Sequence, residues 1–171
     1  MTIIKAAAVQ ISPVLYSREG TVGKVVEKII ELGRQGVQFA TFPETVVPYH
    51  PYFCFVQRPF EMGAQHLQLL EQAVPIPSAT THAIGEACKQ AHIVVSIGVN
   101  ERDRGTLYNT QLLFDADGTL LQHRRRFPRP IMSAWSGGRE TVPGFGLSTA
   151  QSGESVSSHA GSITIRWPAT H

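Results

Sequence analysis

A strand–helix–strand pattern in the first 43 residues constrains the fold more than any other feature of the chain. Residues 3–11 form an almost continuous apolar run, which predicts a buried strand ended by a Ser-Pro pair. Residues 18–35 carry apolar side chains three and four positions apart, which predicts an amphipathic helix, and residues 37–43 predict a second strand. Two strands joined through a helix run parallel in one sheet, so the pattern predicts an α/β fold.

Similar patterns continue to about residue 125. Helices are expected over residues 61–72 and 81–91, and the uniformly apolar residues 93–99 predict a third strand that is buried on both faces. Residues 106–114 and 119–123 predict an antiparallel hairpin, because the Asp-Ala-Asp-Gly segment between them has the composition of a turn.

The composition excludes several classes of protein. The 171 residues are 42% hydrophobic and 16% charged, too apolar for a disordered chain, and no apolar run reaches the roughly 18 residues of a membrane helix. A net charge of +2 without a basic stripe gives no reason to expect nucleic acid as a partner. Cys54 and Cys88 make neither a disulfide framework nor a zinc site, and no glycine-rich nucleotide motif is present, so no metal or cofactor is expected. A cytoplasmic enzyme or binding domain, with no secretory signal and no membrane partner, is the default.

Glu44 is the residue best placed for chemistry. It lies in the segment Phe-Pro-Glu-Thr-Val-Val-Pro, just past a predicted buried strand, and ligand sites of open α/β sheets lie at such strand ends. Beside the apolar Phe42, Val46 and Val47, this carboxylate would be a plausible general base with a raised pKa. The alternative from local sequence is a helix-capping or loop carboxylate.

Three longer segments resemble a known family. They are residues 7–13 (Ala-Ala-Val-Gln-Ile-Ser-Pro), 39–52 (Phe-Ala-Thr-Phe-Pro-Glu-Thr-Val-Val-Pro-Tyr-His-Pro-Tyr) and 105–120 (Gly-Thr-Leu-Tyr-Asn-Thr-Gln-Leu-Leu-Phe-Asp-Ala-Asp-Gly-Thr-Leu). With the His-Arg-Arg string at 123–125, they are similar to the nitrilase branch of the carbon–nitrogen hydrolase superfamily, from about residue 3 to 125.

The resemblance implies an αββα four-layer sandwich, of which residues 1–125 would form the amino-terminal half, leaving the sandwich incomplete. It also implies a Glu–Lys–Cys triad in which Glu44 is the general base. The implied reaction hydrolyses a small-molecule nitrile to a carboxylic acid and ammonia through a covalent thioimidate. Members of the family form homo-oligomers.

Two parts of that triad are missing from the chain. Arg126 stands where the family continues with lysine, and arginine is no equivalent because its larger, planar guanidinium does not give up a proton. The family nucleophile lies in a Cys-Trp-Glu-His-Tyr-Asn-Pro motif, which the chain does not contain. Cys54 and Cys88 are expected to be buried apolar thiols rather than substitutes, and His50 is expected at the mouth of the pocket.

The sequence changes character at Arg126. Residues 126–171 contain one leucine, no lysine, eight serines and six glycines, without sustained periodicity. A shifted reading frame takes the third base of each codon with the first two bases of the next codon. With a free choice of synonymous codons, residues 131–144 can then spell His-Glu-Arg-Met-Val-Trp. In the same way, residues 158–171 can spell Thr-Cys-Trp-Glu-His-Tyr-Asn-Pro. Both passages use the same phase. We therefore infer a frameshift at or just before Arg126, and expect residues 126–171 to be a disordered, out-of-frame tail.

Three functions remain open. The first is a nitrilase by descent, inactive as written. The second is an aliphatic amidase or carbamoylase of the same superfamily, with the same triad acting on an amide. The third is a truncated, non-catalytic fragment that at most associates with intact subunits. The residues around Glu44 favour the first, although aliphatic, aromatic and cyanide-hydrating relatives share them.

Overall fold

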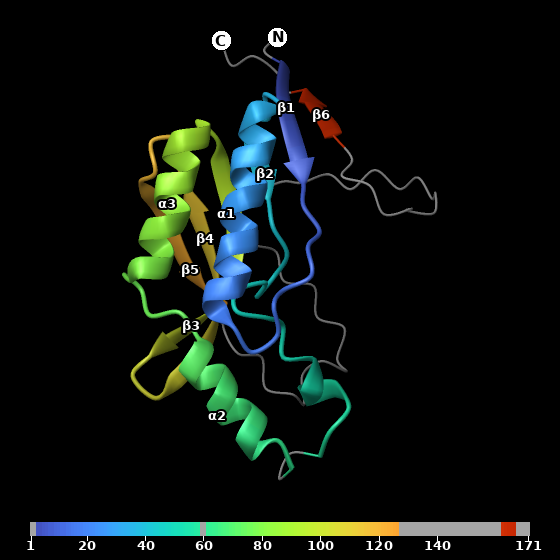
Figure 1. Ribbon diagram of the computed structural model, residues 1–171, viewed down its shortest axis with the longest axis vertical. Coiled ribbons are helices and arrows are strands. Elements are labelled where there is room, and N and C mark those ends of the chain that lie inside the picture. Colours follow the sequence, from blue (N-terminus) through green and yellow to red (C-terminus); the bar gives the residue numbers. More distant parts are fainter. Residues whose placement is uncertain (1–2, 59–60, 127–161, 167–171) are drawn as a thin grey trace. The chain divides into compact units, whose positions relative to one another are not determined.

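A six-stranded mixed sheet organises the chain. The structure, a computed structural model, describes residues 3–58, 61–126 and 162–166, all within one compact unit. The elements in chain order (Figure 1) are β1 (Ile3–Ala8), α1 (Arg18–Arg34), β2 (Phe39–Thr41), the 3₁₀ helix η1 (Tyr52–Phe55), α2 (Gly63–Gln72), α3 (Ala79–Ala91), β3 (Val94–Asp103), β4 (Thr106–Phe114), β5 (Leu120–Arg125) and β6 (Ser162–Arg166).

The strands lie in the order β5-β4-β3-β2-β1-β6. β2 runs parallel to both of its neighbours, β1 and β3, and the remaining pairs are antiparallel. This confirms the predicted strand–helix–strand unit and the hairpin of β4 and β5. β3 runs to Asp103, beyond the predicted end at residue 99, because its polar last residues pair with β4 in a second hairpin.

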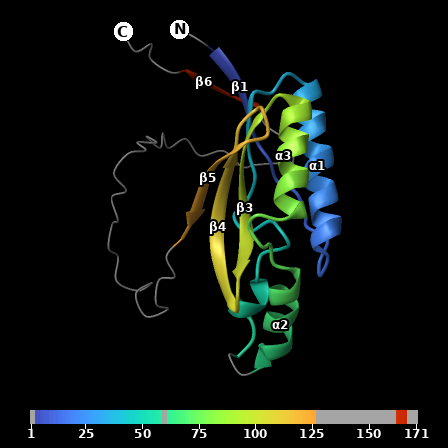
Figure 2. The ribbon, with the colours of Figure 1, turned by 90° about the vertical axis from the view of Figure 1, so that its left-hand side faces the viewer.

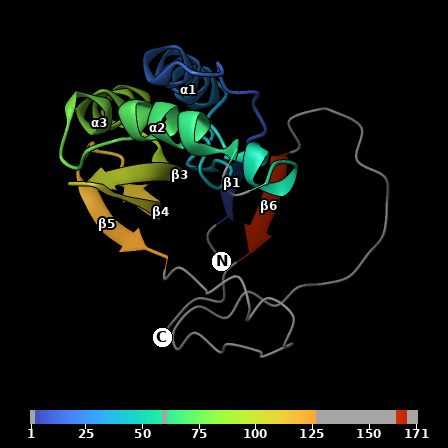
Figure 3. The ribbon, with the colours of Figure 1, turned by 90° about the horizontal axis from the view of Figure 1, so that it is seen from below.

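Helices α1 and α3 cover one face of the sheet, as Figures 2 and 3 show from two sides. The apolar side chains of α1 pack with those of the central strands, and Ile29, Ile84 and Ile97 are fully buried among them. The two helices lie close together at Gly33, where an added Cβ would come within 2.7 Å of Ala91. The sheet with its helices therefore forms one α and one β layer of the expected sandwich.

Strand alternation decides which side chains point away from these helices. Val95, Ile97 and Val99 of β3 are buried in the core on the helix side, so Ser96 and Gly98 belong to the opposite face. The cross-strand partners of Ser96 and Gly98 on β4 are Leu113 and Gln111, and Gln111 donates a hydrogen bond to Ser96 Oγ over 2.8 Å. The helix-free face is thus partly polar, and it is this face that the site below adjoins.

The tail expected to be disordered contains one described strand. Ser162–Arg166 pairs with β1 as an antiparallel edge strand, which differs from the expectation for those five residues. Its Ser-Ile-Thr-Ile-Arg sequence alternates β-branched apolar and polar residues, too briefly to predict a strand alone. Residues 127–161 and 167–171 lie outside the described part, so the domain boundary at 125 stays a prediction.

Candidate functional site

The loop that carries Glu44 is bonded along its length to β3. At its start the Phe42 amide donates to Ser96 O over 2.8 Å, and further on the Asn100 amide donates to Val47 O over 2.7 Å. Between these bonds the loop crosses Gly98, where an added Cβ would lie 2.5 Å from Thr45 N and 2.7 Å from Glu44 Cα. The absence of a side chain at Gly98 therefore allows the Glu44 backbone to lie directly against the strand.

Buried polar contacts hold the second half of this loop. Thr21 of α1 donates its hydroxyl to Pro48 O over 2.8 Å, and Asn100 Nδ2 donates to Tyr49 O over 2.7 Å. Thr45 adopts a left-handed backbone with φ of 49°, a conformation that costs free energy and persists only where its surroundings impose it. A carboxylate on such a loop has a defined position before any ligand arrives.

Glu44 itself is half-exposed and has two donors. Asn109 Nδ2 of β4 and Arg126 Nη1, one residue beyond β5, both donate to Glu44 Oε1. The Arg126 amide also donates to Asn109 O over 2.7 Å, so backbone and side chains bring the three residues together. Glu44 therefore belongs to a network of three groups that come from separate parts of the chain.

The prediction of a raised pKa for Glu44 is wrong. Burial does raise the pKa of this carboxyl, but the hydrogen bonds from Asn109 and Arg126 and the charge of Arg126 outweigh it and hold the pKa below its usual value. Phe42, Val46 and Val47 point into the core, and the Glu44 side chain stays 47% exposed. In this structure Glu44 is an ionised carboxylate that can accept a proton only weakly while Arg126 is bound to it.

Arg126 departs from the family's lysine in the sequence, and in the structure it is the charged partner of Glu44. The alternation of side chains on a strand that ends in His-Arg-Arg could have indicated that Arg126 lies on the opposite face from Arg125. Asn109, which also bonds to Glu44, had no such signal, because an asparagine within a strand carries no chemistry that local sequence can identify.

The two cysteines lie apart from this network. Cys88 is fully buried in α3, and burial raises its pKa to about 12, so it is inert at neutral pH. The prediction of a buried thiol is wrong for Cys54, which lies on the short helix η1 and is exposed. Its Sγ lies 3.9 Å from His66 Nε2. Among the hydrogen bonds of the described residues, none joins either thiol to Glu44.

His50 lies at the end of the Glu44 loop, and its place at the mouth of a pocket stays a prediction, since it lines neither of two hollows that lie among the described residues. Its Nδ1 is 2.7 Å from Thr45 Oγ1, and its ring meets Tyr52 edge-on at 4.6 Å and stacks with Phe55 at 6.0 Å. The charge of His50 contributes to the lowered pKa of Glu44. His50 thus links Glu44 to an exposed aromatic group on η1.

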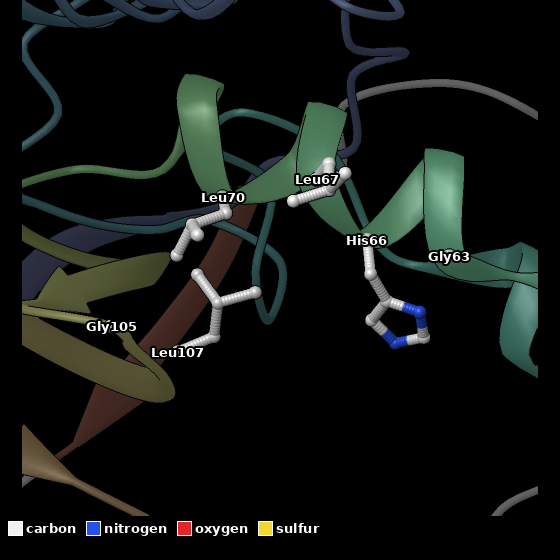
Figure 4. A pocket seen from close by; sticks show the side chains of 6 residues that line it. All are labelled: Gly63, His66, Leu67, Leu70, Gly105 and Leu107. Carbon is white, nitrogen blue, oxygen red and sulfur yellow. The ribbon is translucent and has the colours of Figure 1, made fainter.

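A separate hollow of about 490 Å³ lies between α2 and the β3–β4 turn (Figure 4). Leu67, Leu70 and Leu107 make it apolar, and His66 stands beside them. Glu44 does not line it, so this hollow is not the predicted site. Within the residues that the structure describes, no three His, Cys, Asp or Glu side chains could hold a metal ion together, and no helix there could span a membrane.

Comparison with known proteins agrees with the resemblance. Residues 5–140 match the carbon-nitrogen hydrolase family model. The chain is 72% identical over 128 residues to nitrilase 3 of an unknown prokaryotic organism, covering 74% of this chain and 39% of that protein. It is 51% identical over 124 residues to a nitrilase of Paraburkholderia phymatum, covering 72% of this chain and 36% of that protein. The chain thus spans less than two fifths of the length of these relatives.

Solved structures support the same fold. A carbon–nitrogen hydrolase from Helicobacter pylori matches with a TM-score of 0.53 at 18% identity, covering 76% of this chain and 41% of that chain. An amidase from Nesterenkonia matches with a TM-score of 0.53 at 15% identity, covering 74% of this chain and 44% of that chain. The family model covers the Glu44 loop, β4 and Arg126 as one stretch, and on that match the chain belongs to the carbon–nitrogen hydrolase family.

Proposed function

We propose that Glu44 is the general base of a nitrilase site that converts a small-molecule nitrile to a carboxylic acid and ammonia. The observation that carries the proposal is the fixed Glu44 loop, with a cationic side chain on the carboxylate at the position where the family has lysine. The 72% identity to a protein named nitrilase supports a nitrile rather than an amide as substrate. Homo-oligomers and a cytoplasmic location belong to the same proposal.

The chemistry requires all three triad members. A nitrile is a weak electrophile, so a thiolate must attack its carbon, and a carboxylate takes the thiol proton as the new C–S bond forms. A lysine ammonium stabilises the negative charge that develops on the nitrile nitrogen. One water then adds to the thioimidate carbon and expels ammonia, which leaves a thioester. A second water adds to the thioester, which breaks the C–S bond, releases the carboxylic acid and returns the thiol.

The 171-residue chain as written is proposed to be inactive. Arg126 forms an ion pair with Glu44, which opposes proton uptake by the carboxylate, and neither cysteine is bonded to Glu44. The frameshift inferred above would account for both changes, because with a free choice of synonymous codons the shifted phase can spell Lys-Ile from residues 125–127 and Cys-Trp-Glu-His near the end. Sequencing codons 120 to 171 tests it, and any codon incompatible with the shifted phase refutes it.

The activity is tested by ammonia release from aliphatic and aromatic nitriles, cyanide and the matching amides. We expect no release by the chain as written, and release from nitriles by the chain with its reading frame restored. Glu44→Gln in the restored chain should reduce the rate by at least about 10²-fold, the usual contribution of a general base. Turnover by the chain as written would contradict the proposed inactivity, and release from amides alone would assign an amidase instead.

A further inference from the structure

A second glutamate, Glu101 of β3, is buried among polar side chains on the helix side of the sheet. Its side chain is 2% exposed and lies on the same face of β3 as the core residues Val95, Ile97 and Val99. A lone buried carboxylate would cost several kcal/mol, on the order of the penalty for any unpaired buried ion. Its partners must therefore explain why it is there.

Three residues satisfy this carboxylate. Thr110 of β4 donates its hydroxyl to Oε2 over 2.6 Å, and His123 Nε2 lies 2.8 Å from the same oxygen. Arg125 donates through Nη2 to Oε1 over 2.6 Å and through Nε over 3.1 Å. Burial would raise the pKa of Glu101, but these donors hold it at about 2, so the group is a carboxylate at neutral pH.

Two of the three partners lie on β5, which is an edge strand. In its register with β4, Leu112 pairs with His123, Gln111 with Arg124 and Thr110 with Arg125. The β5 residues after Leu120 are all exposed, so little apolar burial specifies this register, and a strand held mainly by its backbone can slip.

The sequence of β5 means that a shift in its register with β4 would change which arginine lies on each face of the sheet. Arg124, Arg125 and Arg126 are consecutive, and successive side chains on a strand point to opposite faces. A shift of one residue would place a different arginine on each face, so positive charge alone does not select Arg125 for Glu101 or Arg126 for Glu44. Selection needs a second contact with a fixed spacing, and His123, two residues before Arg125, provides it.

We propose that Glu101 is a positioning residue: by holding His123 and Arg125 on the helix side, it fixes the register of β5 and so sets which cation meets Glu44 on the other face. The Arg126 amide donates to Asn109 O over 2.7 Å, and this bond connects the register of β5 to the residues around Glu44. That Glu101 fixes the register does not depend on the proposed function. Only the catalytic importance of the cation beside Glu44 rests on it. The same device would place a lysine at position 126.

The test is a carbon-13 NMR titration of the Glu44 carboxyl in the full chain, which needs no turnover. Arg126→Gln gives the reference in which Glu44 has lost its cation, and its midpoint should lie above that of the unsubstituted chain. Glu101→Gln keeps the shape of the side chain and should move the Glu44 midpoint up to the same value. Combining both substitutions should add nothing further.

Asp103→Asn is the matched control. Asp103 also accepts from Arg125, over 2.8 Å, but its side chain is 45% exposed and has no contact with His123 among the described bonds. We expect this variant to leave the Glu44 midpoint unchanged.

A purely structural Glu101 would give a different result. Glu101→Gln would then lower the free energy of unfolding and leave the Glu44 midpoint where it was, which would overturn the proposal. If Glu101→Gln does not fold, Arg125→Lys and His123→Gln, which remove one β5 contact each, are titrated instead, and an unchanged midpoint in both is equally decisive. Absence of nitrile hydrolysis in the restored chain would refute the proposed function without affecting this outcome.

Discussion

Replacing Gly98 by alanine should destabilise the chain and displace Glu44. The added Cβ would lie 2.5 Å from Thr45 N, 2.7 Å from Glu44 Cα and 2.7 Å from Pro43 O. Ordinary contacts are about 3.5–4.0 Å, so the loop must move away by about 1 Å at three points. All three atoms belong to the backbone, so no side chain can rotate to make room.

The expected cost follows from these contacts. Overpacking a well-packed site costs typically about 1–3 kcal/mol, and we expect the upper end because the loop is bonded to β3 on both sides of Gly98. The same movement separates Glu44 from Asn109 and Arg126, so the pKa of Glu44 should rise.

Urea denaturation followed by circular dichroism measures the first effect, and the carboxyl titration measures the second. Gly23→Ala is the matched control, because Gly23 lies inside α1 with nothing within 4 Å of an added Cβ. Alanine there should stabilise the helix by up to about 1 kcal/mol. If Gly98→Ala were as stable as the Gly23→Ala chain, the close approach of loop and strand would not exist as described.

Three further predictions concern other parts of the fold. The folded-state pKa of Glu101, about 2, lies below its usual value of 4.5, so its contribution to stability is present above about pH 4.5 and is lost as the pH falls toward 2. Urea midpoints measured across this range should therefore fall less steeply in Glu101→Gln. Ser17→Ala removes the side chain that caps α1 by accepting from the Gly20 amide over 3.0 Å, and should cost about 1 kcal/mol in the same assay, whereas no loss would show that the cap is not formed. A thiol reagent should label exposed Cys54 in the folded chain and Cys88 only after unfolding, since Cys88 is fully buried. Mass spectrometry of digests measures the order of labelling, and earlier labelling of Cys88 would contradict the prediction.

Periodicity predicted the elements of this fold well, because each depends on residues close together in sequence. The apolar stripe of α1 and the buried run of β3 gave their positions to within a few residues, and the strand end after β2 located Glu44. The environment of Glu44 could not be read in the same way. Asn109 lies 65 residues away and Arg126 lies 82 residues away, and together they reverse the direction of its pKa shift.

The environment of Glu101 could not be predicted from the sequence either. An acidic residue near the end of an apolar strand is typical of a strand that is leaving the core, yet Glu101 is among the most buried side chains of the described residues. Only the pairing of β3, β4 and β5 brings Thr110, His123 and Arg125 to it. Charge networks of this kind become visible when the register is known.

The separation of Glu44 from its partners also affects the order of folding. The loop at residues 42–50 is supported by β3, about fifty residues later, and its carboxylate is held by groups contributed by β4 and the residue after β5. Contacts between distant residues form late, since a long stretch of chain must first be ordered. During synthesis the glutamate would therefore emerge early and acquire its orientation only after residue 126 has left the ribosome. The ionisation of this one side chain should then report whether the whole sheet, from β1 to β5, has been assembled.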